Sequence, residues 1–170
     1  MSKAYLLGVL HDSTERKNTY RISSKEKSYI QFLSKMIQKM GHKAWTYRES
    51  KSRSMYVVEF SKSVMNDAEV NNRKNKIDYI RGYFDAEGSV PRSSDTRFYI
   101  YFAQKDEDDL DQLKAYITEL GIICGKTHNP SKKRDPHYWR FFVSCKSYKN
   151  FIEKIGSWHP IKSQFLRMKI

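Results

Sequence analysis

The stretch "YIRGYFDAEGSV", residues 79–90, places two acidic residues in an otherwise apolar and aromatic run. Asp85 and Glu87 directly follow this run, in a chain that carries far more positive than negative charge. A buried carboxylate is costly unless a cationic group or ion meets it. The stretch therefore predicts that something binds at least one of the two acids.

A related stretch lies near the N-terminus. "YLLGVLHDS", residues 5–13, aligns with "YIRGYFDAE", residues 79–87, on Gly8 and Gly82. Further on, "KEKSYIQFLSKMIQKMG", residues 25–41, aligns with "KDEDDLDQLKAYITELG", residues 105–121. Both segments repeat apolar residues at i, i+3, i+7 and i+10 and end in glycine, which is typical of an amphipathic helix with a glycine at its C-terminus.

Strand patterns repeat as well. "NTYRIS", residues 18–23, matches "FYIYFA", residues 98–103, and "MYVVEFS", residues 55–61, matches "YWRFFVS", residues 138–144. Alternating side chains in these segments predict half-buried strands. Each half is therefore predicted to contain a helix, a hairpin, a second helix and a second hairpin, with a further helix at "SYKNFIEKIG" in the second half.

The predicted fold class is α+β, with two pseudo-symmetric αββαββ(α) repeats. The expected repeats are residues 1–61 and 76–170, joined by a polar linker at 62–75. Two tandem copies can pair about a pseudo-twofold axis, as the subunits of a homodimer do. The two antiparallel sheets would then form a basic saddle that could lie along a nucleic-acid duplex.

Composition favours a folded protein with a polyanionic partner. The chain has 170 residues, 39% of them hydrophobic, and 32 Lys and Arg against 19 Asp and Glu give a formal net charge of +13. Nucleic acid is the commonest partner of such a charge. Cys124 and Cys145 form no disulfide framework and no zinc-ligand spacing with the histidines, which predicts an intracellular protein of the cytoplasm, the nucleoid or an organelle. We expect no membrane segment and no signal peptide.

The segment "YIRGYFDAEG" resembles the signature of the LAGLIDADG homing endonucleases, and the order of the repeats is that of single-chain, two-motif members of the family. The resemblance covers nearly the whole chain. It implies that the two motif helices pack side by side at the centre of the molecule, where Gly8, Gly82 and Ala86 let the backbones approach closely. It also implies that the last acid of each motif emerges at its helix end, over the centre of the DNA.

In the second half that acid is Glu87. By the resemblance it coordinates a divalent cation, Mg²⁺ or Mn²⁺, that bridges to the scissile phosphate and helps to activate water. Asp85 is expected to make hydrogen bonds at the helix end instead.

The first half departs from the motif. Counting five residues on from the motif glycine gives Glu87 in the second half but Ser13 in the first, and a hydroxyl cannot replace a carboxylate as a metal ligand of equal strength. Either Asp12 reaches the site through an altered helix end, or that half has lost its acid. Cutting both strands, nicking one strand and binding without cutting all stay open.

A second feature of the family is a polar–basic pair where a hairpin meets the next helix. Here it is Gln104 with Lys105 in the second half, and Ser24 with Lys25 in the first. The resemblance implies that the two lysines offset charge on phosphoryl oxygens and that Gln104 positions water.

Strand alternation also predicts a face for DNA. Tyr20 and Ile22 are expected to pack under the helices, so the opposite face would enter the major groove. The residues expected to contact DNA are Lys17, Thr19, Arg21, Arg48, Arg53, Arg92, Arg97, Tyr99, Tyr101, Lys126, His128, Lys132, Lys133, Arg134 and Arg140. Trp158, His159 and Pro160 are expected to fix the C-terminal segment against the second half.

These features favour a monomeric, metal-dependent, site-specific endonuclease of double-stranded DNA, encoded by a mobile intron or a similar element. The alternative is a protein of this fold that has lost cleavage and acts as an RNA maturase on intron RNA or as a DNA-binding regulator. Ser13 is the reason to keep the alternative, and the position of Asp12 relative to Glu87 discriminates between the two.

Overall fold

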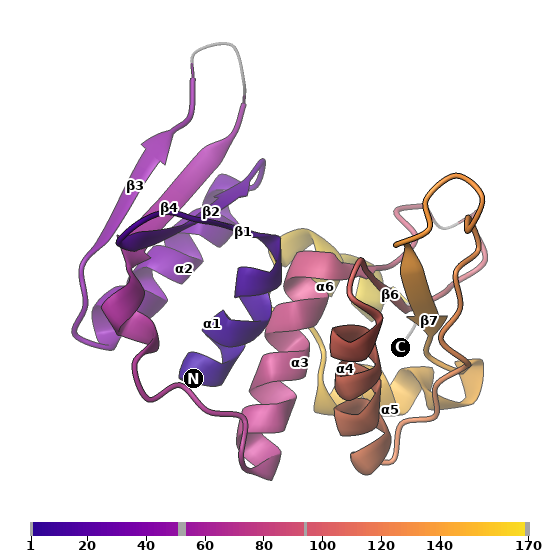
Figure 1. Cartoon of the computed structure of the whole chain (residues 1–170). Helices are drawn as coiled ribbons and strands as arrows, with labels where there is room; N and C mark the ends of the chain where they lie inside the picture. Colours follow the sequence, from indigo (N-terminus) through magenta and orange to yellow (C-terminus); the bar gives the residue numbers. More distant parts are fainter. Residues whose placement is uncertain (1, 51–53, 94, 169–170) are drawn as a thin grey trace.

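Two helices that carry the repeated motif lie side by side at the centre of the molecule (Figure 1). The structure is a computed structural model and describes residues 2–50, 54–93 and 95–168. The central helices are α1 (Lys3–Val9) and α3 (Arg73–Glu87). Figure 1 shows both rising in the same direction, so that their C-terminal tips lie between the two sheets.

The first repeat forms a four-stranded sheet in the order β1-β2-β4-β3, in which every neighbouring pair is antiparallel. Tyr20, Ile22, Val58 and Phe60 point from it into a core that they share with α1 and α2. The elements after α1 are η1 (Leu10–Asp12), β1 (Ser13–Glu15), β2 (Thr19–Ser24), α2 (Lys27–Lys39), β3 (Ala44–Arg48) and β4 (Tyr56–Ser61).

The second repeat forms a three-stranded antiparallel sheet in the order β5-β6-β7. Two isolated bridges, Cys124 with Val143 and His128 with Arg140, lie where the first repeat has β3. The elements after α3 are β5 (Gly88–Ser89), β6 (Tyr101–Gln104), α4 (Glu107–Glu119), β7 (Trp139–Phe142), η3 (Cys145–Ser147), α5 (Tyr148–Lys154) and α6 (Pro160–Arg167). The predicted α+β class with two antiparallel sheets and central motif helices is confirmed.

The helices lie where the apolar spacing predicts them. Ile30, Leu33 and Ile37 of α2 are buried, as are Leu110, Leu113 and Ile117 of α4. Gly41 and Gly121, just beyond these helices, have φ values of 84° and 78°. This left-handed conformation is the one in which glycine commonly ends a helix.

The segment between the repeats is partly helical. The 3₁₀ helix η2 (Lys62–Met65) lies in it, and α3 begins at Arg73, inside the expected linker. The side chain of Asn72 caps α3 by accepting a hydrogen bond from the backbone N–H of Asn75 at 2.9 Å. The domain boundaries given above stay predictions.

The C-terminal segment packs differently from the prediction. Trp158 stacks on Tyr5 with ring centroids 4.6 Å apart and joins the core of the first repeat, not that of the second. Leu166 of α6 does lie in the core of the second repeat. The segment thus bridges the two halves, because the two motif helices leave Tyr5 of α1 open to it.

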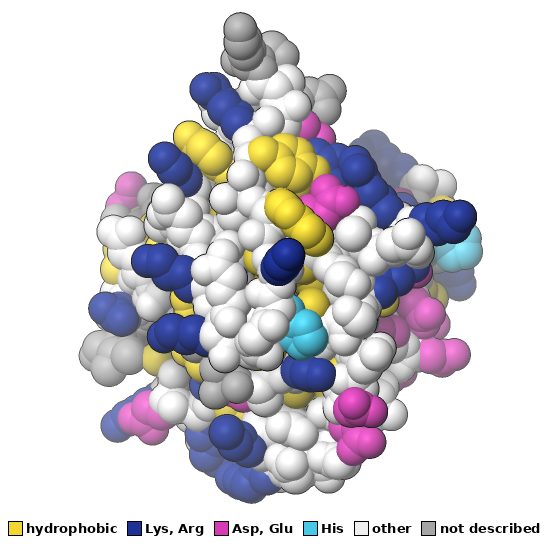
Figure 2. Space-filling view, turned by 90° about the vertical axis from the view of Figure 1, so that its left-hand side faces the viewer, with side chains coloured by type: hydrophobic (Ala, Val, Ile, Leu, Met, Phe, Trp, Pro, Cys, Tyr) yellow, Lys and Arg dark blue, Asp and Glu magenta, His cyan; other side chains and the backbone are white. Residues whose placement is uncertain are grey.

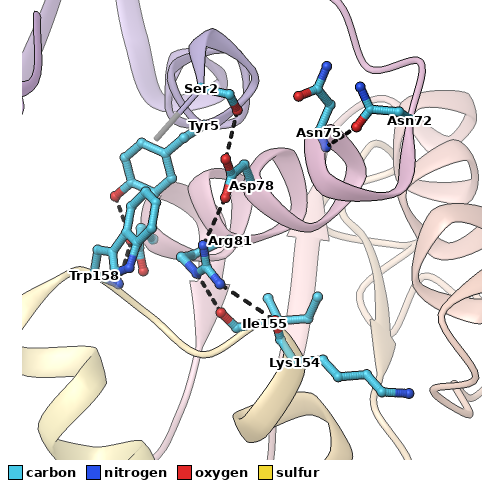
Figure 3. A network of polar contacts seen from close by, with 10 residues as sticks. Ser2, Tyr5, Asn72, Asn75, Asp78, Arg81, Lys154, Ile155 and Trp158 are labelled. Carbon is cyan, nitrogen blue, oxygen red and sulfur yellow. Dashed lines mark hydrogen bonds and ion pairs between the residues drawn. The ribbon is translucent and has the colours of Figure 1, made fainter.

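Arg81 ties this bridge to the central helices (Figure 3). Its guanidinium donates to Asp78 at 2.9 Å and to the carbonyl oxygen of Ile155 at 2.5 Å, and it lies 4.3 Å from the ring centroid of Trp158. Asp78 in turn accepts a hydrogen bond from Ser2 at 2.7 Å. In the described part of the chain, no helix is long and apolar enough to cross a membrane.

Candidate active site at the tips of the motif helices

The two motif helices approach each other through glycine. A Cβ atom added to Gly82 would lie 2.0 Å from the carbonyl oxygen of Tyr5, and one added to Gly8 would lie 2.2 Å from the carbonyl oxygen of Tyr79. Each glycine therefore faces the backbone of the other helix. This contact brings the tips of α1 and α3 together. Ala86, the third small residue of the motif, lines a pocket at the tips.

Glu87 is the last residue of α3 and Gly88 the first of β5. A Cβ atom at Gly88 would lie 2.1 Å from the ring of Phe84, so the chain can turn into the strand here only without a side chain. The turn leaves Glu87 half-buried on the wall of a pocket of about 390 Å³.

Asp12 occupies the matching junction in the first repeat. It is the last residue of η1, and Ser13 is the first of β1. A 3₁₀ helix rises about 2.0 Å per residue and an α-helix about 1.5 Å, so three 3₁₀ residues advance the chain about as far as four α-helical ones. Leu10–Asp12 thus compensates for the one residue by which the first motif is shorter, and Asp12, not Ser13, lies at the helix end.

Ser13 has a different place in the structure. Its hydroxyl donates a hydrogen bond to the carbonyl oxygen of Leu10 at 2.7 Å, and its backbone pairs with Ile22 in the sheet. The backbone N–H of Ser13 donates to the same carbonyl oxygen, so Ser13 holds the end of the turn through two bonds. Ser13 therefore closes the 3₁₀ turn that presents Asp12.

Asp12 and Glu87 line the same pocket and influence each other's charge. Desolvation raises the pKa of Glu87, and the Asp12 carboxylate raises it further, while Lys162 lowers it. Partial desolvation also raises the pKa of Asp12, although its side chain is exposed, and Lys162 lowers it. The pocket therefore holds two carboxylates whose ionised forms repel each other.

These donors fit Mg²⁺ or Mn²⁺. Within the described ranges, no three His, Cys, Asp or Glu side chains gather closely enough to hold a metal ion by themselves. Mg²⁺ usually binds through one or two carboxylates, keeps several water molecules and takes its remaining ligands from substrate phosphates. Two hard oxygen donors whose charges repel match that requirement, because a divalent cation relieves the repulsion.

Asp85 belongs to the structure around the pocket. Its side chain is 3% exposed and accepts hydrogen bonds from the hydroxyl of Tyr5 at 2.6 Å and the backbone N–H groups of Trp158 at 3.0 Å and His159 at 3.1 Å. The hydroxyl of Ser157 donates a further bond. Asp85 thus joins α3 to α1 and to the C-terminal segment, rather than capping its own helix.

The other predicted catalytic residues lie apart from this pocket. Ser24 lines it, but Lys25, Gln104 and Lys105 are not among the described residues that do. The side chain of Gln104 accepts a hydrogen bond from the N–H of Lys105 at 2.7 Å, and Lys25 and Lys105 are exposed. The sequence reasoning did not single out Lys162, which lines the pocket from α6.

On the first sheet, the face turned away from the core is polar. The register places Arg21, Glu59 and Trp45 in one row of that face. Glu59 accepts hydrogen bonds from Thr19 at 2.7 Å and from the hydroxyl of Tyr47 at 2.8 Å, and Thr19, then Tyr47, lower its pKa. Arg21 forms an ion pair with Glu49 at 2.5 Å. Two of the predicted DNA contacts, Thr19 and Arg21, therefore already bind acidic side chains of the protein.

Arg48 does not share this face. It pairs with Tyr56, which packs against the core, so the register places Arg48 on the opposite side of the sheet from Arg21. Trp45 and Tyr47, which the sequence reasoning did not single out, are 51% and 39% exposed on the polar face. Figure 2 shows the left-hand side of the molecule in Figure 1, where Lys and Arg side chains are spread among a few acidic ones and hydrophobic side chains lie toward the top.

On the second sheet, the corresponding face is aromatic and basic. Tyr101 pairs with Phe142, and Ala103 with Arg140, in rows opposite to the buried Phe102 and Phe141. The Arg140 guanidinium lies 5.1 Å from the ring centroid of Phe142. The ring of His128 stacks on Phe142 from the neighbouring segment.

The remaining predicted DNA contacts lie in turns and loops. Tyr99 is half-buried with its ring centroid 5.5 Å from that of Tyr101, the other described ones are exposed, and Arg53 lies outside the described residues. The exposed ones are Lys17, Arg92, Arg97, Lys126, Lys132, Lys133 and Arg134.

A family model for a LAGLIDADG-like domain matches residues 74–156. The matched residues run from the start of α3 to just beyond α5. The predicted resemblance to the LAGLIDADG family is therefore confirmed, with the shared motif at the end of α3.

Solved LAGLIDADG structures match nearly the whole chain. I-DmoI in complex with DNA and Ca is similar with a TM-score of 0.70 and 18% sequence identity, over 98% of this chain and 96% of that one. I-DmoI in complex with DNA and Mn is similar with a TM-score of 0.68 and 19% identity, over 91% and 95%.

The N-terminal LAGLIDADG domain of DUF199/WhiA is similar to a comparable degree, with a TM-score of 0.69 and 14% identity over 90% of this chain and 79% of that one. At these identities the similarities show a shared fold. The sequence matches no curated protein.

Proposed function

We propose that this chain is a site-specific, divalent-metal-dependent DNA endonuclease of the homing type. It binds a long duplex with its two antiparallel sheets and hydrolyses phosphodiesters at the centre of the site. The observation that carries the proposal is the pair of Asp12 and Glu87, which lie at matching helix-to-strand junctions on the wall of one pocket. A pair of carboxylates at the shared tip of two helices attracts a divalent cation, whose remaining ligands a DNA phosphate and water would supply.

In this proposal Asp12 and Glu87 would hold Mg²⁺ or Mn²⁺, which would supply Lewis-acid polarisation of the phosphate and a more acidic water molecule. The open faces of the sheets bind the duplex on either side. Arg140 with Tyr101 and His128 on one sheet, and Arg21 with Thr19 on the other, offer both base-edge and phosphate contacts. Lys25, Gln104 and Lys105 lie away from the pocket, so we assign them to the flanks of the scissile phosphates.

The similar proteins support the DNA-directed part of the proposal. The structures of I-DmoI, a homing endonuclease, contain DNA together with Mn or Ca. One of them contains target DNA nicked in its coding strand. Divalent cations at a duplex are consistent with the hard oxygen donors that this pocket offers.

A second candidate function is binding without cleavage, as an RNA maturase or a DNA-binding regulator. Two observations favour it. By residue count Ser13 stands where the second motif has Glu87, and the ammonium group of Lys162 already offers positive charge to both carboxylates. The position of Asp12 on the same pocket wall as Glu87 favours the endonuclease, because two carboxylates that face one pocket offer the oxygen ligands that a divalent ion needs.

The proposal is tested by a cleavage selection on a randomised duplex library, with Mg²⁺ and with chelator. We expect cleaved molecules that share a sequence, and only when metal is present. Glu87→Gln should abolish cleavage of the selected site and leave binding to it largely intact, because the substitution removes a metal ligand and keeps the shape of the side chain. Binding to a selected site with no scission in Mg²⁺ or Mn²⁺ would favour the second candidate function.

A further inference from the structure

Lys162 reaches into the pocket from the first turn of α6. Its ammonium group donates to the carbonyl oxygens of Phe84 at 2.8 Å, Asp85 at 2.8 Å and Ala86 at 3.3 Å. These three carbonyls belong to the last turn of α3, immediately before Glu87. The last carbonyls of a helix lack partners within the helix and carry partial negative charge, so a cation is stabilised there.

The same ammonium group lies in the field of three carboxylates. Desolvation lowers the pKa of Lys162 to about 8, while Asp85, Glu87 and Asp12 act in the opposite direction and Arg92 acts with the desolvation. In return, Lys162 lowers the pKa of each of these carboxyl groups. Lys162 is therefore the counter-charge that the protein itself supplies to the acid pair.

An ammonium group has three N–H donors, and three carbonyl oxygens already accept them. Lys162 therefore has no donor left for a phosphate or for either acid of the pair. Its effect on Asp12 and Glu87 must act through charge and through the position of the end of α3.

The C-terminal segment holds Lys162 in this place. Asp85 accepts the backbone N–H groups of Trp158 and His159, and the ring nitrogen of His159 accepts the N–H of Lys162 at 3.5 Å. Trp158 is fixed between Tyr5 and Arg81. The bridge between the two repeats thus ends in the lysine that faces both acids.

We propose that Lys162 is a positioning residue of the active site: a resident cation that holds the end of α3 and balances Asp12 and Glu87 until a divalent ion binds. This inference rests on the proposed function, since it assigns the metal to the same two acids. A divalent ion that enters the pocket meets the repulsion of Lys162, so the lysine keeps metal binding weak in the absence of DNA. The phosphate charge of a bound duplex then offsets that repulsion, and metal binding becomes coupled to DNA binding.

The test measures Mn²⁺ binding to the full chain without DNA, by the electron paramagnetic resonance signal of the free ion. Lys162→Met removes the charge and keeps an unbranched side chain. We expect it to tighten Mn²⁺ binding roughly tenfold or more, because a unit charge close to the ion is removed from a partly desolvated site. Lys162→Gln, which keeps an N–H donor for the carbonyls of α3, should tighten it similarly, and Lys162→Arg should leave it near the wild-type value.

The matched control is Lys149→Met on α5, which makes the same change in net charge at a side chain that is 81% exposed. If Lys162 only stabilised the fold, both neutral variants would bind Mn²⁺ as wild type does or more weakly, and this result would overturn the inference. Equal tightening in Lys149→Met would overturn it as well. Glu87→Gln separates the two proposals when it is added to the wild type and to each Lys162 variant. If it leaves the Mn²⁺ affinity of all of them unchanged, the assignment of the metal to Glu87 is wrong, and the failure lies there and not in the role of Lys162.

Discussion

Asp85 and Glu87 belong to one motif and are two positions apart, yet their environments differ. Asp85 is buried and accepts hydrogen bonds from α1 and the C-terminal segment, whereas Glu87 faces the pocket. Hydrogen-bond donors offset the cost of burying the first acid. Glu87, the second acid, faces the pocket instead, where the positive charge of Lys162 stabilises its carboxylate and Asp12 lies on the same wall.

His159 offers a test of this environment by pH. Burial, and then the positive charges of Lys162 and Arg92, lower its pKa to about 4. Because the unfolded chain binds a proton to this ring more readily than the folded protein does, the ring's contribution to stability is complete above about pH 6.5 and is lost as the pH falls toward about 4. We therefore expect acid to destabilise the protein partly through His159.

The measurement is urea unfolding of wild type and of His159→Asn at about pH 7.5 and about pH 4.5. Asparagine keeps a side-chain acceptor at the start of α6 but does not titrate. The wild type should lose more stability between the two pH values than the variant does, whatever the other carboxyl groups contribute. An equal loss in both proteins would show that His159 is free to take up its proton in the folded state.

At the scale of elements, the close approach of α1 and α3 places the acid pair. Gly82→Ala would put a methyl group 2.0 Å from the carbonyl oxygen of Tyr5, which belongs to backbone and cannot turn aside. We expect a loss of about 1–3 kcal/mol or more in the free energy of unfolding, as for an overpacked core. We also expect a loss of cleavage, because the helix tips must separate.

Gly125→Ala is the matched control for Gly82→Ala. The nearest atom to the added methyl group would be the carbonyl oxygen of Phe142 at 3.6 Å, an ordinary contact. This substitution should leave stability within about 1 kcal/mol of wild type or raise it slightly. Thermal and urea unfolding of the three proteins check the prediction, and a Gly82→Ala protein as stable as the control would contradict the packing of the helices.

Most elements could be predicted from the sequence, because helix and strand periodicity is local. The apolar spacing of residues 30–40 and 110–120 and the alternation in residues 55–61 suffice for α2, α4 and β4. The end of α1 could not be settled. Whether the chain continues there as an α-helix or tightens into a 3₁₀ turn depends on the hydrogen bond from Ser13 to Leu10 and on the pairing of β1. Counting residues from the motif glycine reveals neither contact.

The packing of the C-terminal segment could not be predicted from the sequence either. Trp158 is apolar and could pack on either half, and its contact with Tyr5 depends on how the two repeats meet. Lys162 was overlooked for the same reason. A lysine in the first turn of a short helix looks like a solvated surface residue until tertiary structure brings it to the end of α3.

At the scale of the whole molecule, the net charge of +13 and the two open sheet faces predict binding that weakens steeply with salt. Each phosphate that the protein neutralises releases counterions, which adds about 0.9 to the slope of log K against log salt for duplex DNA. Replacing Lys132 and Lys133, in the exposed loop before β7, with Gln should lower the slope by about 1 for each phosphate that is no longer neutralised. Lys149→Gln on α5 should leave the slope unchanged, and a slope that none of these substitutions alters would place the DNA elsewhere.

Cleavage of each strand of a selected target, followed separately in Mg²⁺, tests the acid pair most directly. Asp12→Asn and Ser13→Ala each change one of the two neighbouring candidates for the acid of the first motif. If Asp12 and Glu87 form the site, Asp12→Asn should lose cleavage as Glu87→Gln does, whereas Ser13→Ala should retain it on both strands. Full cleavage by Asp12→Asn would contradict the pairing of these two acids.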